Sequence, residues 1–170
     1  MKKIILFMLL ACMLAGSMLV PHSKQLKDGL YLVDKVVYDT NAVMLKPNQV
    51  FVHFNHDFSA NAPGNSVGLI VNIADYVPLL LAEEPTLLSQ TENQKKLQLT
   101  FSPPAAEKLE RFTAANVMKQ AVMIVDGEVL TIHKIRDAIR GGKMEITGAS
   151  DNDCQRIYVM LKNHHIEKPR

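Results

Sequence analysis

The stretch from Ala121 to Gly148 constrains the fold more than any other part of the chain. It opens with a β-prone apolar run that ends at Val125, and a second apolar run follows the dipeptide Asp126-Gly127. An Asp-Gly pair between two such runs indicates a two-residue type I′ turn, because that turn needs φ > 0 at both central positions. The sequence therefore predicts a β-hairpin, with Asp126 and Gly127 as structural turn residues.

A short helical or looped crossing and a third strand are expected after the hairpin. Gly141 and Gly142 break the pattern and let the chain turn into Lys143–Thr147, which reads as a strand. Gly148 is the last structural turn residue that we predict.

Two amphipathic helices flank this central stretch. Ser102 followed by two prolines predicts the start of the first helix, whose inward face is Ala105, Leu109, Phe112 and Asn116. Ser150 or Asp151 is expected to cap the second helix. Its apolar residues, with i, i+3, i+4, i+7 spacing, are Cys154, Ile157, Tyr158 and Leu161. We expect Cys154 to be a buried, unreactive residue on this helix.

Several further strands precede the first helix. Alternating or continuous apolar residues predict them at Leu30–Val37, Val50–Phe54, Val67–Ile73 and Lys95–Phe101, and Ala42–Leu45 is a candidate partner of the first. We expect a turn at Lys46–Gln49, a loop at His56–Ser66, and a loop or short helical turn at Thr86–Gln94. Pro78 argues against a long helix through Ala74–Glu84 and leaves open a helix that begins at this proline. Strands and helices mixed in this order predict the α+β class: an antiparallel or mixed β-sheet with helices packed on one face.

A set of spaced residues gives the chain a family resemblance. They are Leu97–Phe101, Phe112-Thr113, Asn116, Ile124–Leu130, Ile135-Arg136, Ile139, Gly141-Gly142 and Ile146–Gly148. This pattern, from about Leu97 to Leu161, resembles the periplasmic head subdomain of the protein-export membrane protein SecD/SecDF. His133 stands where that family has a proline, and Ala149-Ser150 stands where Asn-Phe often follows the last glycine.

The resemblance implies a head-like α+β fold and a non-enzymatic module that contacts polypeptide or a partner protein of the cell envelope. The export activity of the full-length proteins depends on several transmembrane helices, so the resemblance of this segment does not imply it. Two candidate contact surfaces are the loop His56–Ser66 and the segment His133–Gly142. Within the second, the predicted partner-binding residues are His133, Ile135, Arg136 and Ile139.

The N-terminus predicts export of the chain to the periplasmic side of a bacterial envelope. Lys2-Lys3 precede an apolar stretch from Ile4 to Val20, which has three interpretations. Cys12 closes a lipobox-like sequence and would be lipidated, Ala15-Gly16-Ser17 would suit ordinary signal peptidase, or the stretch would remain as a membrane span. The predicted organisation is therefore a signal peptide or anchor (1–20), a tether (21–29), an N-terminal β extension (30–66), a head-like domain (67–163) and a polar tail (164–170).

Charge and motif content argue against several function classes. Lys2 and Lys3 account for the whole net charge of +2, since the other 17 basic residues face 17 acidic ones, so we expect no nucleic-acid partner. We find no nucleophile motif and no metal-ligand spacing, and we predict no catalytic residue, metal or cofactor.

The alternative is an envelope hydrolase or metal-dependent enzyme with an unrecognised site. The largest pocket would favour that alternative if it gathered His53, His56 or His133 with carboxylates. An exposed apolar patch or an unpaired strand edge would favour binding.

Overall fold

A computed structural model describes residues 26–38, 43–54, 67–91, 94–147 and 151–162. Several predictions lie outside these residues. They concern the N-terminal segment with Cys12, the loop His56–Ser66, the turn at Gly148, Ser150 as a cap, and the polar tail.

The described residues form eight strands and two helices. In chain order they are β1 (Gly29–Val37), β2 (Gln49–Phe54), β3 (Val67–Pro78), β4 (Thr86–Thr91), β5 (Gln94–Thr100), α2 (Pro103–Ala115), β6 (Gln120–Val125), β7 (Glu128–Lys134), β8 (Lys143–Thr147) and α3 (Asp151–Lys162). All neighbouring strands pair antiparallel. The predicted α+β class is therefore confirmed.

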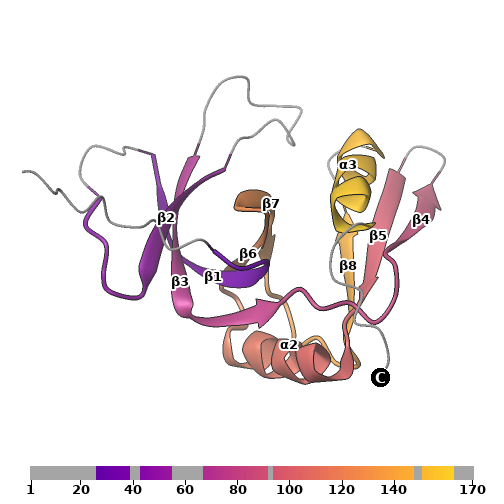
Figure 1. Cartoon of the computed structure of the whole chain (residues 1–170), viewed down its shortest axis with the longest axis horizontal. Coiled ribbons are helices and arrows are strands. Elements are labelled where there is room, and N and C mark those ends of the chain that lie inside the picture. Colours follow the sequence, from indigo (N-terminus) through magenta and orange to yellow (C-terminus); the bar gives the residue numbers. More distant parts are fainter. Residues whose placement is uncertain (1–25, 39–42, 55–66, 92–93, 148–150, 163–170) are drawn as a thin grey trace, which may run out of the picture.

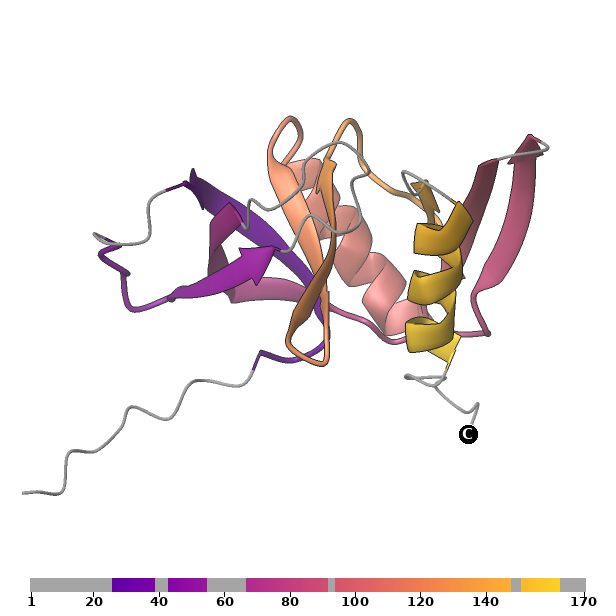
Figure 2. The ribbon, with the colours of Figure 1, turned by 90° about the horizontal axis from the view of Figure 1, so that it is seen from above.

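The strands divide into two sheets. One has five strands in the order β2-β3-β1-β6-β7, and the other has three in the order β4-β5-β8. The two sheets stand apart, with α2 along one side of the molecule and α3 against the smaller sheet (Figure 1). Seen from above, α2 spans the interval between the sheets (Figure 2). The N-terminal strand β1 lies between β3 and β6, so it belongs to the same sheet as the hairpin.

A shared apolar core holds these layers together. The larger cluster of buried side chains draws on both sheets and both helices, and Leu97, Leu109 and Leu161 are each 0% exposed within it. A second cluster, centred on Leu69 and Val71, covers the other face of the five-stranded sheet. Because close-packed apolar burial is the main stabilising term in folding, the two sheets and the helices form one cooperative unit around the larger cluster.

The hairpin forms as the sequence predicts. Asp126 has φ 52° and Gly127 has φ 80°, the signs that a type I′ turn requires. Val125 pairs with Glu128 across the turn, and the backbone N–H of Asp126 donates to Asp28 Oδ1 at 2.8 Å. The strand after the Gly-Gly break is also confirmed as β8, but it pairs with β5 of the other sheet. The chain between the hairpin and β8 is a loop without a helical turn.

Both helices are confirmed. Ser102 is the N-cap residue of α2, although its side chain makes no capping hydrogen bond. The predicted inward residues Ala105, Leu109 and Phe112 are buried. On α3, Cys154 is 0% exposed and its thiol donates to the Lys95 carbonyl at 3.2 Å.

The structure differs from one local prediction and excludes two alternatives that the sequence left open. No helix begins at Pro78: β3 runs to that residue, and Val77, Leu79 and Leu81 alternate into the core at 0%, 1% and 0% exposure. The expected loop or short helical turn at Thr86–Gln94 contains the strand β4 (Thr86–Thr91) and the first residue of β5, because pairing with β5 overrides its weak local propensity. Residues 43–45 of the candidate strand Ala42–Leu45 form no strand.

Candidate functional site

The four predicted partner-binding residues line one cavity. It has a volume of about 340 Å³ and lies where α2, the end of β7 and the start of β8 meet. His133 is contributed by β7, and Ile135, Arg136 and Ile139 by the loop that follows it. We call the loop 135–142, between β7 and β8, the crossing segment. The second predicted contact surface, His56–Ser66, lies outside the described residues.

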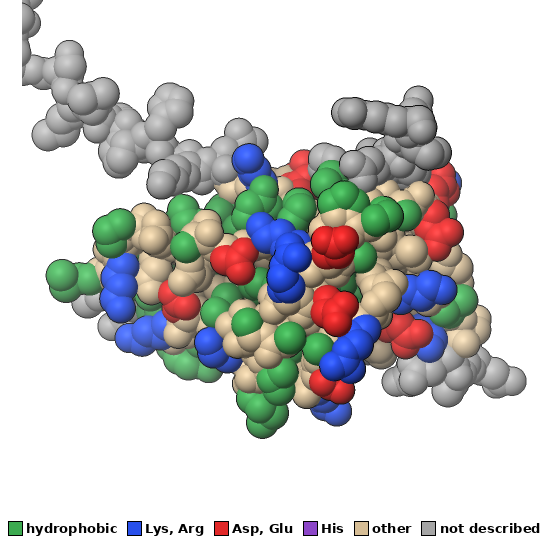
Figure 3. All heavy atoms as spheres, turned by 90° about the horizontal axis from the view of Figure 1, so that it is seen from below, with side chains coloured by type: hydrophobic (Ala, Val, Ile, Leu, Met, Phe, Trp, Pro, Cys, Tyr) green, Lys and Arg blue, Asp and Glu red, His purple; other side chains and the backbone are tan. Residues whose placement is uncertain are grey.

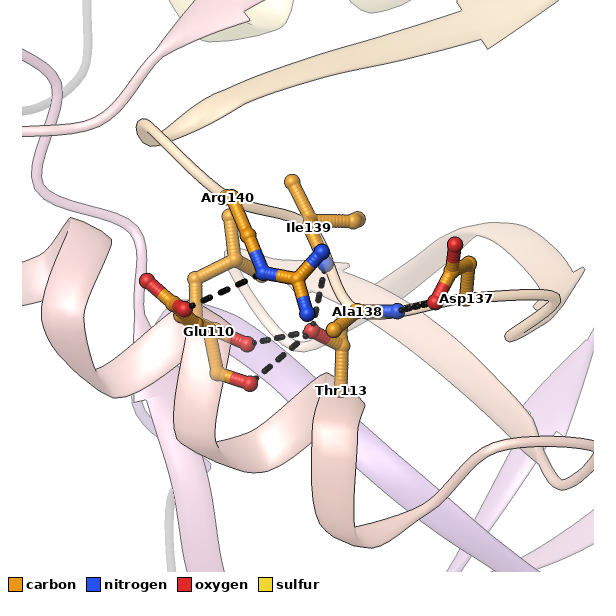
Figure 4. A network of polar contacts seen from close by, with 7 residues as sticks. Glu110, Thr113, Asp137, Ala138, Ile139 and Arg140 are labelled. Carbon is orange, nitrogen blue, oxygen red and sulfur yellow. Dashed lines mark hydrogen bonds and ion pairs between the residues drawn. The ribbon is translucent and has the colours of Figure 1, made fainter.

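The middle of the crossing segment is fixed to α2. The backbone N–H of Ile139 donates to Thr113 Oγ1 at 2.9 Å, and the same hydroxyl donates to the Leu109 carbonyl at 2.7 Å. Arg140 Nε lies 3.6 Å from Glu110 Oε1 in an exposed ion pair. Figure 4 shows these contacts converging on the last turns of the helix. The cavity wall is therefore held by specific bonds and not by packing alone.

Both ends of the crossing segment are also bonded. Ile135 exchanges two backbone hydrogen bonds with the chain after α2, donating to Lys119 O at 2.9 Å and accepting from Met118 N at 2.8 Å. Gly142 O accepts from Phe101 N at 2.8 Å. A Cβ added to Gly142 would lie 2.5 Å from the Ala106 Cβ, so only glycine allows this close approach to α2.

The lining of the cavity is mainly apolar. Its apolar residues come from β1, α2, β6, β8 and the crossing segment: Leu30, Leu109, Phe112, Ala121, Ile135, Ala138, Ile139 and Met144. The charged residues that line it are Lys134, Arg136, Asp137 and Glu145. Thr113 also lines it, but its hydroxyl is already committed to Leu109 and Ile139. Such a cavity suits an apolar side chain or a similar small apolar group.

His133 is a lining residue with a buried, unpartnered polar atom. Its Nε2 is buried and has no hydrogen-bond partner among the described residues. Burial also lowers the pKa of His133 below its usual value of 6.5, so the ring is neutral at neutral pH.

The two carboxylates that line the cavity accept hydrogen bonds from groups other than His133. Asp137 Oδ1 accepts from Ala138 N at 2.7 Å, and both oxygens of Glu145 accept from Lys96 Nζ at 3.0 Å. His133 is therefore not part of a hydrogen-bonded acid–base pair in the described structure, although it shares a cavity with carboxylates.

The described structure contains no arrangement suited to a metal. No group of three or more His, Cys, Asp or Glu side chains within the described ranges is placed to bind an ion. His53 is exposed on β2 and contacts the Phe51 ring edge-on. A larger cavity of about 660 Å³, lined by Asp28, Tyr76 and Asp126 among others, has no histidine in its wall.

Acidic and basic side chains are intermingled on the face that carries α2. Figure 3 shows red and blue side chains alternating there with apolar ones. Exposed ion pairs on α2 include Arg111 with Glu107 and Lys108 with Asp75. This surface has no single-sign field of the kind that attracts nucleic acid. Neither helix of the described region is long and apolar enough to cross a lipid bilayer.

Sequence reasoning identified the part of the cavity lining that follows β7 in the chain, but not the part that the other elements supply. We expected strand or helix positions for Leu30, Phe112, Ala121 and Met144. No local sequence pattern indicates that these residues surround one cavity. Thr113 is the residue whose position in the sequence could have indicated that another segment packs against α2 here. It lies four residues after Leu109 on the apolar face of α2, where a buried hydroxyl needs a partner.

Comparison with known proteins gives a consistent set of similarities. The family model described as "SecDF, P1 head subdomain" matches residues 81–165. The SecDF translocase subunit of Thermus thermophilus is 35% identical over 75 residues, which cover 44% of this chain and 10% of that protein. The SecD subunit of Acidaminococcus fermentans is 32% identical over 71 residues, covering 41% of this chain and 17% of that one.

A solved structure is similar over the same region. It is described as that of a membrane component SecDF that enhances protein export, with 30% identity and a TM-score of 0.43 over 54% of this chain and 44% of the other. The matches to the translocase subunits of T. thermophilus and A. fermentans thus span only a small part of their length. The segment of this chain matched by the family model begins after β3.

Proposed function

Because this chain belongs to the SecDF P1 head subdomain family, we propose that it is a non-enzymatic binding module that assists protein export by contacting polypeptide. The contact surface in this proposal is the cavity beside the crossing segment. Binding there is weak and reversible, as a chain in transit requires.

One observation carries the proposal. The short stretch that contains His133, Ile135, Arg136 and Ile139 lines a single mainly apolar cavity together with residues of β1, α2, β6 and β8, and its wall is bonded to α2. A preformed apolar cavity binds a side chain without first ordering its own wall, which lowers the entropic cost of a transient contact.

The proposal places the module on the periplasmic side of a bacterial envelope, to which its N-terminal segment delivers it. Lipidation of Cys12, cleavage after the small residues, or retention as a span are the three routes. Labelling with radioactive palmitate separates the first route from the other two: incorporation that is lost in Cys12→Ala supports the lipid anchor.

The enzyme alternative receives less support. His133 shares its cavity with Asp137 and Glu145, but both carboxylates are engaged by other partners. The descriptions of the relatives name translocase subunits and a component that enhances protein export, and these descriptions name no hydrolase.

In-cell photocrosslinking tests the proposal. A photoreactive amino acid replaces Arg136 at the cavity, and in a matched variant it replaces Arg111, an exposed arginine on the outer face of α2. We expect crosslinks to an exported polypeptide arrested in transit from position 136 and not from position 111. Equal crosslinking from both positions, or none from position 136, would contradict the proposed site.

A further inference from the structure

The edge of β8 that faces away from β5 is unpaired in the described part of the chain. β8 ends the three-stranded sheet, and β5 is its only partner among the described strands. An unpaired edge presents a row of backbone donors and acceptors that a further extended chain can satisfy.

The register shows which backbone groups point to that edge. Phe101 N donates to Gly142 O, so the pair Phe101–Gly142 is a hydrogen-bonded one. Hydrogen-bonded and non-hydrogen-bonded pairs alternate along an antiparallel ladder. Met144 and Ile146 therefore bond to β5, whereas Lys143, Glu145 and Thr147 direct their N–H and C=O groups away from it.

The same edge adjoins the cavity of the proposed site. Met144 and Glu145 line it from β8, and Met144 points into the core on the side where the cavity lies. An extended chain beside β8 places every second side chain on that inner side, because side chains alternate along a strand. One of them then meets the apolar cavity.

The charges around the cavity favour an acidic residue in the bound polypeptide. Lys96 neutralises Glu145 through two contacts of 3.0 Å. Lys96 does not line the cavity itself, but together with Lys134 and Arg136 it outnumbers the two lining carboxylates, which leaves one net positive charge around the cavity among the described residues.

We propose that the polypeptide binds as an added β-strand on the free edge of β8, away from β5, with an apolar side chain in the cavity and an acidic residue next to it. This inference rests on the proposed function and specifies its geometry. Backbone bonds to Lys143, Glu145 and Thr147 are independent of sequence, so many different chains bind, and the cavity selects only one apolar side chain.

Hydrogen exchange of the full-length chain tests this geometry. The probe is reduced, carboxymethylated lactalbumin, a permanently unfolded acidic polypeptide. On binding we expect slower exchange at the amides of Lys143, Glu145 and Thr147. Met144 and Ile146 are bonded to β5 already and should change little. Binding without protection of the first three amides would overturn the strand pairing and leave the proposed function standing. Absence of binding would overturn both.

A proline at the edge gives a second test. Glu145→Pro removes an outward N–H that the fold does not use, and proline is tolerated at such edge positions. Glu145→Ala is the control, because it removes the same carboxylate and keeps the N–H. We expect the proline variant to bind the probe about tenfold more weakly than the alanine variant. Equal affinities, with Met144 and Ile146 amides still protected, would contradict the proposal.

Discussion

The backbone N–H of Ile139 donates a hydrogen bond of 2.9 Å to the side-chain oxygen of Thr113. The same oxygen donates its own hydrogen to the Leu109 carbonyl at 2.7 Å. One hydroxyl therefore joins the middle of the crossing segment to α2 and fixes the wall of the proposed binding cavity.

Replacing this hydroxyl should loosen the wall. Thr113→Val keeps the shape of the side chain but leaves the partly buried Ile139 N–H without its acceptor. We expect a loss of about 1–3 kcal/mol in the free energy of unfolding. Denaturant unfolding measures the loss, and hydrogen exchange at Ile139 should become faster. Thr113→Ser, which keeps the hydroxyl, is the control. Unchanged exchange at Ile139 in the valine variant would show that the bond does not hold the crossing segment.

The two adjacent glycines should differ in their tolerance of a side chain. Gly141 and Gly142 have φ of 71° and 68°, so alanine at either position costs about 1–2 kcal/mol of backbone strain. Only Gly142→Ala also brings a Cβ to 2.5 Å from Ala106, whereas the space around Gly141 is open. Gly142→Ala should therefore lower the free energy of unfolding more than Gly141→Ala.

A double-mutant cycle isolates the steric part of this difference. Ala106→Gly removes the methyl group that Gly142→Ala would strike, so the combined variant should recover the excess loss. Strict additivity of the two changes would contradict a direct clash between these positions.

The sequence predicts local structure well where the signal is local. The turn at Asp126-Gly127 and the start of α2 after Ser102 depend on neighbouring residues, and both are confirmed. The strand β4 depends instead on pairing with β5, because Ser89 and Gln90 have little β propensity of their own. At Pro78, proline is compatible with both a helix start and a strand end, and the burial of Leu79 and Leu81 favours the extended chain.

The candidate site could likewise be predicted from the sequence only in part. The segment from His133 to Gly142 could be singled out because its residues carry the family resemblance. Its assembly with Leu30 and Phe112 into one cavity could not, since these residues are far apart in sequence and only the packing of two sheets around α2 brings them together.

Tyr31 should make stability sensitive to high pH. Burial raises the pKa of Tyr31 from 10.0 to about 12, with a further contribution from nearby Tyr76, and its hydroxyl donates to Lys27 O at 2.6 Å. The unfolded chain releases this proton at lower pH than the folded one. The corresponding stability is therefore complete below pH 10.0 and is lost as the pH rises towards about 12.

Unfolding of Tyr31→Phe measures this effect, because the variant has no phenol to ionise at that position. We expect a smaller loss of stability at high pH than in the wild type. Tyr38→Phe removes a phenol that is 86% exposed and serves as the control, with an expected wild-type response. Identical pH dependence of the wild type and Tyr31→Phe would contradict the prediction.

His133 should make stability sensitive to mild acid. Its Nε2 is buried without a partner in the described structure, and burial lowers the pKa of this imidazole below 6.5. As the pH falls below 6.5, the unfolded chain takes up a proton that the folded chain still excludes. Stability is therefore complete above that pH and decreases below it, until the pH reaches the lower pKa of the folded state.

The comparison of two phenylalanine variants tests this prediction. Urea unfolding at about pH 8 and about pH 5.5 brackets the range in which histidine titrates. His133→Phe removes the buried nitrogen and keeps an aromatic ring, so its stability should fall less between the two pH values than that of the wild type. His53→Phe changes an exposed histidine and should respond to acid as the wild type does. If both variants lose stability equally, the buried imidazole is not the acid-sensitive group, and another group causes the loss of stability in acid.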